Sequence, residues 1–318
     1  MIIWGYDNIP HALRGSVIVL GNFDGVHIGH QEIIKTAIAI ASRGGLKVGI
    51  LTFDPHPNIV LGKVTNHKLL MNLPRKLNSL LSQGIDFVIV ASFTKTFSSL
   101  SADEFISKVL FESLNAMHIV TGYNFRFGER GAGDNKLLAK YSTKLGFSYT
   151  QVNHIKYLGL EVSTSHIKTL ISTGRIHLAA HLLGRRYEIA GRVDIGGRIA
   201  GPALSTPTAN IVLDTDLLVP LLGVYLVEGE VDGKNTYWGI ANIGVKPTIK
   251  NISTPLLEVH LFDFNDNLYG KDIKISLISF IRPERKFDNF DKLKYAISSD
   301  KIFCRYLLRN LNSLLLIS

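Results

Sequence analysis

The sequence is poor in cysteine: Cys304 is the one thiol in 318 residues. A single cysteine excludes an internal disulfide framework. No apolar run approaches the ~20 residues that a helix needs to cross a bilayer. Residues 1–7 also lack the basic region, apolar core and cleavage site of a secretion signal. We therefore expect a soluble, cytoplasmic protein without a membrane partner.

The sequence also lacks blocks of like charge, repeats and low-complexity linkers, although its net charge is +9. A basic chain suits polyanionic partners such as nucleotides, phosphorylated cofactors or RNA, but a general basic bias of the host proteome explains the charge equally well. RNA-binding modules usually interleave aromatic with basic residues or carry a basic stripe. Neither pattern is evident, so we do not expect a nucleic-acid partner.

What is present is an α/β pattern in the first half of a chain whose length suits two domains. Apolar, strand-like runs alternate with helical stretches. The expected strands are 16–20, 46–53, 85–91, 118–121 and 147–152, and the expected helices are 29–42, 101–114 and 134–145. Gly44 and Gly45 are expected to end the first helix, and a capping box at residues 101–104 is expected to begin the second. This alternation predicts a doubly wound parallel sheet, which binds ligands where the carboxyl ends of strands meet the amino ends of helices.

After residue 163 the pattern changes to short helices followed by strands. The helices are expected at 166–172 and 176–183, the strands at 187–193, 208–213, 224–231, 236–240, 256–261 and 273–280, and a terminal helical region at 288–316. Asp232 and Gly233 form a favourable hairpin turn. Six antiparallel strands predict a small β-barrel with terminal helices. We place the domain border after residue 184, which gives domains 1–184 and 185–318.

The most informative segment runs from Gly21 to His30 (GNFDGVHIGH), between the first strand and the first helix. Its glycines let the backbone approach a ligand, and the helix amino terminus attracts phosphate. His27 and His30 lie three residues apart and can both donate hydrogen bonds to phosphate oxygens. Surface histidines often show the same spacing, and a zinc site would need ligands that the sequence does not clearly offer. The complete pattern favours a phosphate-binding site.

This segment resembles a known family. Its His-x-Gly-His element is similar to the nucleotidylyltransferase signature, and the longer pattern resembles the bacterial bifunctional riboflavin kinase/FMN adenylyltransferases (FAD synthetases). Three later segments agree with that family, namely 51–57 (LTFDPHP), 122–128 (GYNFRFG) and 163–168 (STSHIK, where the family has Ser-Ser-Thr-x-Ile-Arg). With the second half included, the resemblance extends over about residues 15–300.

The resemblance implies a first domain that transfers AMP from ATP to FMN and so makes FAD. Because the FMN phosphate is already anionic, its attack needs no strong base; the protein must align the reactants and stabilise the leaving pyrophosphate, with help from Mg²⁺. His27 and His30 would contact the transition state. The other residues implied are Gly21, Asn22, Phe23, Asp24, Gly25, Gly29, Asn124, Ser163, Thr164, Ser165 and Lys168 for ATP, and Phe53, Asp54, Phe125 and Phe127 for the flavin.

Two of these assignments have alternatives. Lys168 stands where the family has arginine, so it keeps the charge but loses the planar fork that grips a phosphate in two places. We expect weaker positioning of ATP or pyrophosphate; the alternative is a solvated helix residue. Phe125 or Phe127 could equally be a core residue that does not contact the flavin.

The second half resembles the riboflavin kinase module of the same family in segments such as 207–210 (PTAN), 241–244 (ANIG), 257–261 (LEVHL) and 282–287 (RPERKF). Phosphorylation of riboflavin needs a neutral hydroxyl to attack the γ-phosphorus of ATP, so a base within reach helps. Glu258 is the candidate base, although alternation also allows an outward-facing strand residue. Thr208 and Asn210 share one face of a strand and can hold Mg²⁺ with the ATP phosphates. Arg282 is implied for the flavin.

One loop of the second half departs from the family, which usually reads Gly-Arg-x-Leu-Gly-Phe-Pro-Thr-Ala-Asn. This chain has Pro202 in place of the arginine and Ser205-Thr206 in place of Gly-Phe. A loop that loses a glycine and gains a proline samples fewer conformations. The kinase activity is therefore less directly implied than the adenylylation.

Three other functions stay open at this point. One is an adenylyltransferase for a different phosphate-bearing acceptor, which the kinase-like half argues against. Another is a monofunctional FAD synthetase whose barrel only binds flavin. The third is a flavin-responsive RNA-binding regulator. For the enzyme we expect riboflavin, FMN and ATP as small-molecule partners, and a monomer or weak self-association.

Overall fold

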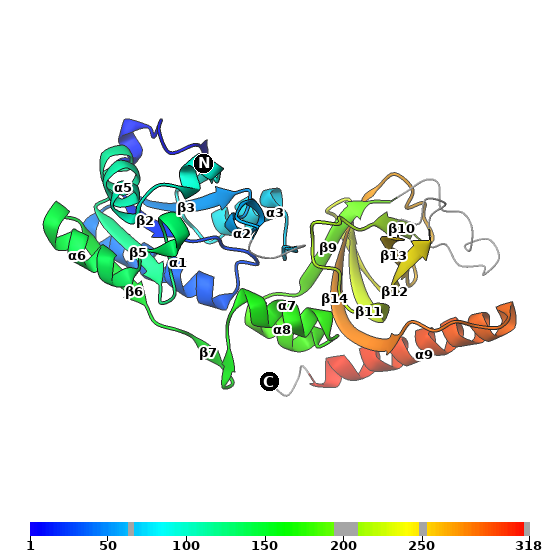
Figure 1. Cartoon of the computed structure of the whole chain (residues 1–318). Coiled ribbons are helices and arrows are strands. Elements are labelled where there is room, and N and C mark those ends of the chain that lie inside the picture. The colour runs from blue at the N-terminus through cyan, green and yellow to red at the C-terminus, as the bar shows by residue number, and fades with distance from the viewer. Residues whose placement is uncertain (63–66, 194–208, 248–252, 315–318) are drawn as a thin grey trace. The chain divides into compact units, whose positions relative to one another are not determined.

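The computed structural model describes residues 1–62, 67–193, 209–247 and 253–314. The chain divides into two compact units, residues 1–166 and 167–318. Each unit is built on a six-stranded sheet (Figure 1). In the described part of the chain, no helix combines the length and the apolar character that a membrane crossing requires.

The first unit is a doubly wound parallel sheet, which confirms the fold predicted from the alternation. The strands are β1 (Ile2–Trp4), β2 (Val17–Leu20), β3 (Val48–Asp54), β4 (Phe87–Ser92), β5 (His118–Gly122) and β6 (Ser148–Val152). They lie in the order β1-β4-β3-β2-β5-β6, and every neighbouring pair is parallel. The order reverses between β2 and β5, which is where ligands bind in such sheets.

Helices cover both faces of this sheet (Figure 1). The helical elements are η1 (His11–Leu13), α1 (Ile28–Gly44), α2 (Pro57–Val60), α3 (Leu73–Leu81), α4 (Lys95–Ser98), α5 (Ala102–Glu104), η2 (Phe105–Ser113), η3 (Glu129–Gly131) and α6 (Asn135–Leu145). Successive side chains of a strand point to opposite faces. Ile18 and Leu20 therefore pack with η2 and α6, whereas Val17 and Val19 pack with α1 and α3. Burial on both faces explains why the strands are almost wholly apolar.

Caps set the ends of the helices. Ser101 and Glu104 form the predicted capping box: the Ser101 hydroxyl accepts the Glu104 N–H at 3.1 Å, and the Glu104 carboxylate accepts the Ser101 N–H at 3.0 Å. The helix that follows continues to Ser113 as the π-helical element η2, a hydrogen-bond pattern that apolar spacing does not reveal. Gly45 ends α1 in the left-handed region at φ 62°, as predicted.

The second unit is an antiparallel barrel. After the hairpin β7 (Lys156–Tyr157) and β8 (Leu160–Glu161) of the first unit, α7 (Thr164–Ser172) spans the unit border and α8 (Ile176–Leu183) follows. The strands are β9 (Tyr187–Arg192), β10 (Ala209–Val212), β11 (Gly223–Val231), β12 (Asn235–Pro247), β13 (Ser253–Leu261) and β14 (Asp272–Pro283). They pair antiparallel in the order β10-β13-β12-β11-β14-β9. The predicted hairpin turn at Asp232 and Gly233 joins β11 to β12, with φ of 49° and 67°.

The two edge strands, β9 and β10, bring the barrel close to closure by packing against each other. Gly191 of β9 faces Ile211 of β10, and a Cβ at position 191 would lie 2.5 Å from Ile211 Cγ2. A larger residue would push the edges apart. The six-stranded barrel predicted from the sequence is thereby confirmed as a nearly closed one.

The terminal helix α9 (Phe290–Leu314) packs on the barrel around Cys304, whose buried neighbours are Val224, Leu226, Ile240 and Phe262. Burial, together with nearby Asp300, raises the pKa of Cys304 to about 12. Arg282 of β14 donates from Nε and Nη2 to the Asp300 carboxylate at 2.7–3.0 Å. Both side chains are mostly buried, at 15 % and 11 % exposed. This pair fastens α9 to the barrel.

Asp300→Asn should lower the free energy of unfolding of the second unit by about 3 kcal/mol, because it leaves the Arg282 guanidinium buried without its counter-charge. Urea titration followed by the fluorescence of Trp238, which packs on the same cluster, measures the change. The control is Asp263→Asn, which neutralises one partner of an exposed pair between α9 and the barrel, Asp263–Arg305. It should change little. Equal destabilisation by both variants would contradict the special contribution of the buried pair.

Candidate functional site

The segment from Gly21 to His30 links β2 to α1 at the point where the strand order reverses. His27 is the N-cap of α1, and its Nδ1 accepts the backbone N–H of His30 at 3.2 Å. Because Nδ1 acts as an acceptor, neutral His27 carries its proton on Nε2. The helix end therefore fixes both the orientation of this imidazole and the atom that donates.

His27 and His30 are brought together as predicted, with their rings stacked at a centroid distance of 3.6 Å and 14° from parallel. Burial lowers the pKa of His30 well below 6.5, and the charges of His27 and Lys76 lower it further. His30 is therefore neutral at neutral pH. Its Nδ1 is buried and has no hydrogen-bond partner within the described residues. A buried polar atom of this kind suits a site where a ligand supplies the partner.

The 21–30 segment has a backbone shape that ordinary residues adopt at a cost. Phe23 and Val26 have φ of 54° and 39°, and each such conformation costs about 1–3 kcal/mol. The surroundings offset this cost. The Phe23 ring is fully buried in the apolar cluster that contains α1 and α3, and the Val26 carbonyl accepts a hydrogen bond from Gln31 Nε2 at 2.9 Å.

Asp24 ties the segment to two distant parts of the chain. Its Oδ1 accepts the Leu70 N–H at 2.8 Å, and its carbonyl accepts the Thr164 hydroxyl at 3.1 Å. The second contact brings the 163–165 segment, at the start of α7, next to the first one. Gly29 leaves room for the His27 ring, since a Cβ there would lie 3.1 Å from its Cε1.

The remaining residues predicted for ATP lie as follows. Ser163 accepts the N–H of His166 at 3.3 Å in the first turn of α7. Lys168 lies one helical turn beyond Thr164, in the part of α7 that belongs to the second unit. Asn124 follows β5 beside Gly122, which packs against α1. The structure thus gathers Asn124 and residues 163–165 around the start of α1; their contacts with ATP stay predictions.

Lys76 of α3 is a residue of this site that the sequence analysis missed. It is 8 % exposed, and its Nζ donates to the Phe53 carbonyl at 3.1 Å, to the Thr52 hydroxyl at 3.2 Å and to the Asn22 carbonyl at 3.4 Å. Burial lowers its pKa from 10.5, while the carboxylates of Asp54 and Asp24 act in the opposite direction.

A signal for Lys76 exists in the sequence. Leu73, Leu77 and Leu80 follow a helical spacing and form the apolar face of α3, and position 76 lies on that face. A lysine is rarely buried without oxygen partners. A lysine on the apolar face of an amphipathic helix is therefore a useful marker of a buried polar site.

The residues predicted for the flavin belong to one aromatic group. Neighbouring ring centroids lie 5.3–6.2 Å apart along Phe53, Phe97, Phe105, Phe127 and Phe125. Phe53 and Phe127 are core residues, whereas Phe125 is half-buried. Contact between these rings and a flavin stays a prediction, as it does for Asp54, which lies half-buried at the end of β3.

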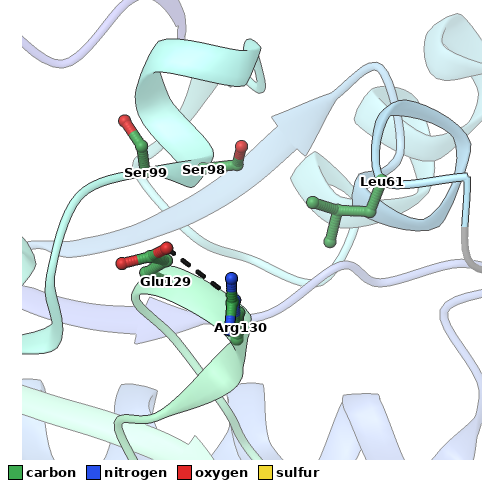
Figure 2. Close-up of a pocket in the computed structure, with 5 residues that line it drawn as sticks. All are labelled: Leu61, Ser98, Ser99, Glu129 and Arg130. Atoms are coloured by element: carbon green, nitrogen blue, oxygen red, sulfur yellow. Dashed lines mark ion pairs between the residues drawn. The ribbon is translucent and has the colours of Figure 1, made fainter.

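A cavity of ≈ 400 Å³ lies in the same unit. Figure 2 shows the residues that line it, Leu61, Ser98, Ser99, Glu129 and Arg130. The serines directly follow Phe97, and the Glu129–Arg130 ion pair at 3.8 Å follows Phe127 by two residues, so two of its walls continue from the aromatic group. Its volume is within the range of small-molecule sites. No sequence pattern pointed to these five residues.

In the barrel, strand register places the predicted kinase residues in one row. Asn210 of β10 lies opposite Glu258 of β13, which lies opposite Asn242 of β12. Asn242 is opposite Val224, and Val224 is opposite Arg282. Directly opposed residues share a face of the sheet. Asn242 is a member of this row that the sequence analysis did not single out.

Glu258 lies on the face opposite to its strand neighbours Leu257 and Val259, both of which are fully buried. Glu258 itself is half-buried, and Asn210 is 4 % exposed. This face of the sheet is therefore largely covered at Asn210 and more open at Glu258. The half-buried position of Glu258 gives its carboxylate access to a ligand.

The contacts of two residues predicted for the second site, Arg282 and Thr208, with flavin and Mg²⁺ stay predictions. The Arg282 guanidinium is engaged by Asp300 and by the Pro283 carbonyl at 3.1 Å, so its observed contacts hold α9, and its contact with flavin stays a prediction. Thr208 lies outside the described residues, as does the altered loop that contains Pro202 and residues 205–206.

The row also fits a magnesium ion. Asn210 supplies an amide oxygen, a type of donor that Mg²⁺ accepts, and the Glu258 carboxylate opposite it adds negative charge. Among the described residues no cluster of three or more His, Cys, Asp or Glu side chains could hold a metal. Mg²⁺ commonly relies on one or two protein ligands and on substrate phosphates, so the donor set present suits an ion that arrives with ATP.

Comparisons with known proteins agree with this division. The family model described as FAD synthetase matches residues 9–166, and the model described as Riboflavin kinase matches residues 183–308. A crystal structure of a Streptococcus pneumoniae protein called a macrolide-efflux protein has a TM-score of 0.85 at 29 % identity and covers 96 % of this chain and 98 % of that one. That likeness supports the fold described above.

Curated relatives carry both activities in their names. The bifunctional riboflavin kinase/FMN adenylyltransferase of Bacillus subtilis is 41 % identical over 301 residues, which cover 92 % of this chain and 94 % of the relative. The protein of that name from Escherichia coli is 34 % identical, with 96 % of each chain covered. The chain therefore belongs to the family of bifunctional riboflavin kinase/FMN adenylyltransferases.

Proposed function

We propose that the first unit transfers AMP from ATP to FMN, which forms FAD, and that the barrel transfers the γ-phosphate of ATP to riboflavin, which forms FMN. The observation that carries the first reaction is the stacked pair His27–His30 at the amino terminus of α1. The two family matches and the bifunctional relatives favour two reactions over a monofunctional synthetase or an RNA-binding regulator.

In the proposed adenylyl transfer, an oxygen of the FMN phosphate attacks the α-phosphorus of ATP and pyrophosphate leaves. His27 Nε2–H and the His30 ring would donate to phosphate oxygens as their charge increases. The free N–H groups of α1 would bind phosphate as well. The hydroxyls of Ser163, Thr164 and Ser165 and the side chain of Asn124 would position the triphosphate, and Lys168 would add positive charge.

We assign the flavin of this reaction to the cavity lined by Leu61 and the Glu129–Arg130 pair. The three segments that line the cavity support the assignment. The first follows Phe53 and Asp54 in the chain, the second contains Phe97, and the third contains Phe125 and Phe127. The Leu61 side chain suits contact with an isoalloxazine ring, and the serine, carboxylate and guanidinium groups suit its polar edge.

In the proposed kinase reaction, the 5′-hydroxyl of riboflavin attacks the γ-phosphorus of ATP, its proton passes to the Glu258 carboxylate, and ADP leaves. Thr208 and Asn210 would hold Mg²⁺, which neutralises phosphate charge when it is bound. Asn242, opposite Glu258, would orient the carboxylate. Arg282 would contribute to the flavin site.

We propose the border between the two catalytic parts at residues 184 and 185, near the start of the riboflavin kinase match at residue 183, whereas the compact units divide after residue 166. Gly184 caps α8 in the left-handed conformation, so the helix ends there. We further propose a cytoplasmic enzyme, monomeric or weakly self-associating, with no nucleic-acid or membrane partner. The single cysteine supports a reducing compartment.

Purified protein should form FAD and pyrophosphate from FMN and ATP, and FMN from riboflavin and ATP, both with Mg²⁺. His27→Ala or His30→Ala should lower FAD formation by about 10²-fold or more and leave FMN formation unchanged, because the imidazoles lie in the first unit alone. Separate chromatographic assays of the two products measure this. Absence of FAD from the unaltered enzyme would refute the adenylyl transfer, and equal loss of both products would contradict two separate sites.

Glu258→Gln should have the reverse effect. Without a carboxylate to accept the hydroxyl proton, FMN formation should fall by about 10²–10⁴-fold, while FAD formation from added FMN continues. The same pair of assays applies. Glu228→Gln, on strand β11 of the same barrel and ion-paired with Arg186, is the matched control. An unchanged rate of FMN formation in Glu258→Gln would remove this residue from catalysis.

Leu61→Trp should fill part of the cavity and raise the KM for FMN in FAD formation by about tenfold without changing the KM for ATP. Ile59→Trp, an exposed position on α2 that does not line the cavity, is the control. Initial rates over a matrix of FMN and ATP concentrations separate the two constants. A rise in the KM for ATP alone would place the nucleotide, and not the flavin, in this cavity.

A further inference from the structure

We propose that Lys76 is a positioning residue of the adenylyl-transfer site: its ammonium group holds the carboxyl ends of β2 and β3 together at the root of the 21–30 segment. The inference rests on the proposed formation of FAD. The proposal adds Lys76 to this site, although Lys76 lies 46 positions after His30 and on a different helix.

The contacts leave this lysine no free donor. An ammonium group has three N–H donors, and the three acceptors are the Phe53 carbonyl, the Thr52 hydroxyl and the Asn22 carbonyl, at 3.1, 3.2 and 3.4 Å. The Thr52 hydroxyl also donates to the Asn22 carbonyl at 3.2 Å. Because all three donors are engaged in the protein, Lys76 must act on a substrate through the segment and not by direct contact.

The Asn22 carbonyl is the critical acceptor. It belongs to the peptide unit that leads into Phe23, whose φ of 54° is unfavourable for a residue with a side chain. Without donors from Lys76 and Thr52, this peptide could rotate and let Phe23 relax. The segment that follows carries His27 and His30, so their placement depends on this anchor. Misplacement of reacting groups by about 1 Å can cost about 10²-fold in rate.

The charge of Lys76 acts at the same place. The groups that interact with it are the carboxylates of Asp54 and Asp24 and the ring of His30. The pKa of His30 is lowered first by burial, then by His27 and then by Lys76. Loss of the lysine charge should therefore raise the pKa of His30 toward its ordinary value.

The test uses the full chain with Lys76→Met, which removes donors and charge, and Lys76→Gln, which removes the charge but keeps amide donors for the carbonyls. Lys140→Met, at an exposed lysine on α6, is the control. Steady-state assays with FMN and ATP give kcat and KM, and NMR follows the His30 ring during a pH titration. Circular dichroism reports folding.

We expect kcat for FAD formation to fall by about 10²-fold in Lys76→Met and by less in Lys76→Gln, whose amide can still donate to a carbonyl, with little change in either KM. The His30 ring should titrate at higher pH, and FMN formation by the barrel should be unaffected. Lys140→Met should behave as the unaltered enzyme. A purely structural lysine would change stability without moving the His30 titration.

A folded Lys76→Met protein with unchanged kcat, or a Lys76→Gln protein with an unmoved His30 titration, would overturn the proposal. If Lys76→Met does not fold, the His30 titration of Lys76→Gln, whose amide can still satisfy a carbonyl oxygen, decides the matter. If the unaltered enzyme forms no FAD, the proposed function fails instead. The NMR titration then still decides whether Lys76 acts on His30.

Discussion

The first unit depends on holding a short, strained peptide segment in one shape. Phe23 and Val26 occupy left-handed conformations that would relax in an isolated peptide. Burial of the Phe23 ring, the hydrogen bonds of Asp24 to Leu70 and Thr164, and the donors of Lys76 keep the segment in place. The consequence is a helix amino terminus with two stacked imidazoles beside it.

In the barrel, strand register alone aligns the polar side chains of the second site. Side chains alternate between two faces, so Leu257 and Val259 fill one side while Glu258 faces the other, in line with Asn210 and Asn242. The pairing of three strands is enough to align these polar groups. Each unit has its own sheet and its own polar site, which suits a chain in which two phosphate-transfer reactions proceed separately.

Much of the fold could be predicted from the sequence because its signals are local. Period-two and helical spacing, the capping box at Ser101 and the turn at Asp232 and Gly233 each depend on residues close in the chain. The three-residue strand β1 is too short to show a pattern. The helix α3 was not predicted, and η2 differs from an α-helix only in its hydrogen bonds.

The site residues also differ in whether a local sequence pattern could reveal them. His27 and His30 are neighbours on one helical turn, so their spacing alone indicated them. Lys76, the residues of the cavity and Asn242 reach their sites through packing and pairing between distant segments, which no local spacing encodes. Arg282 was predicted as a site residue, but its partner Asp300 was not, because a helix from the far end of the chain supplies that carboxylate.

By itself the sequence determined the two sheet types and led to the prediction of a phosphate-binding segment with two histidines, because each follows from residues within a few positions of one another. Only the tertiary structure decided how the strained segment is anchored, that His30 is buried and neutral, and which carboxylate holds Arg282. Those properties arise from desolvation and from contacts across the fold, and both exist only once the chain has folded.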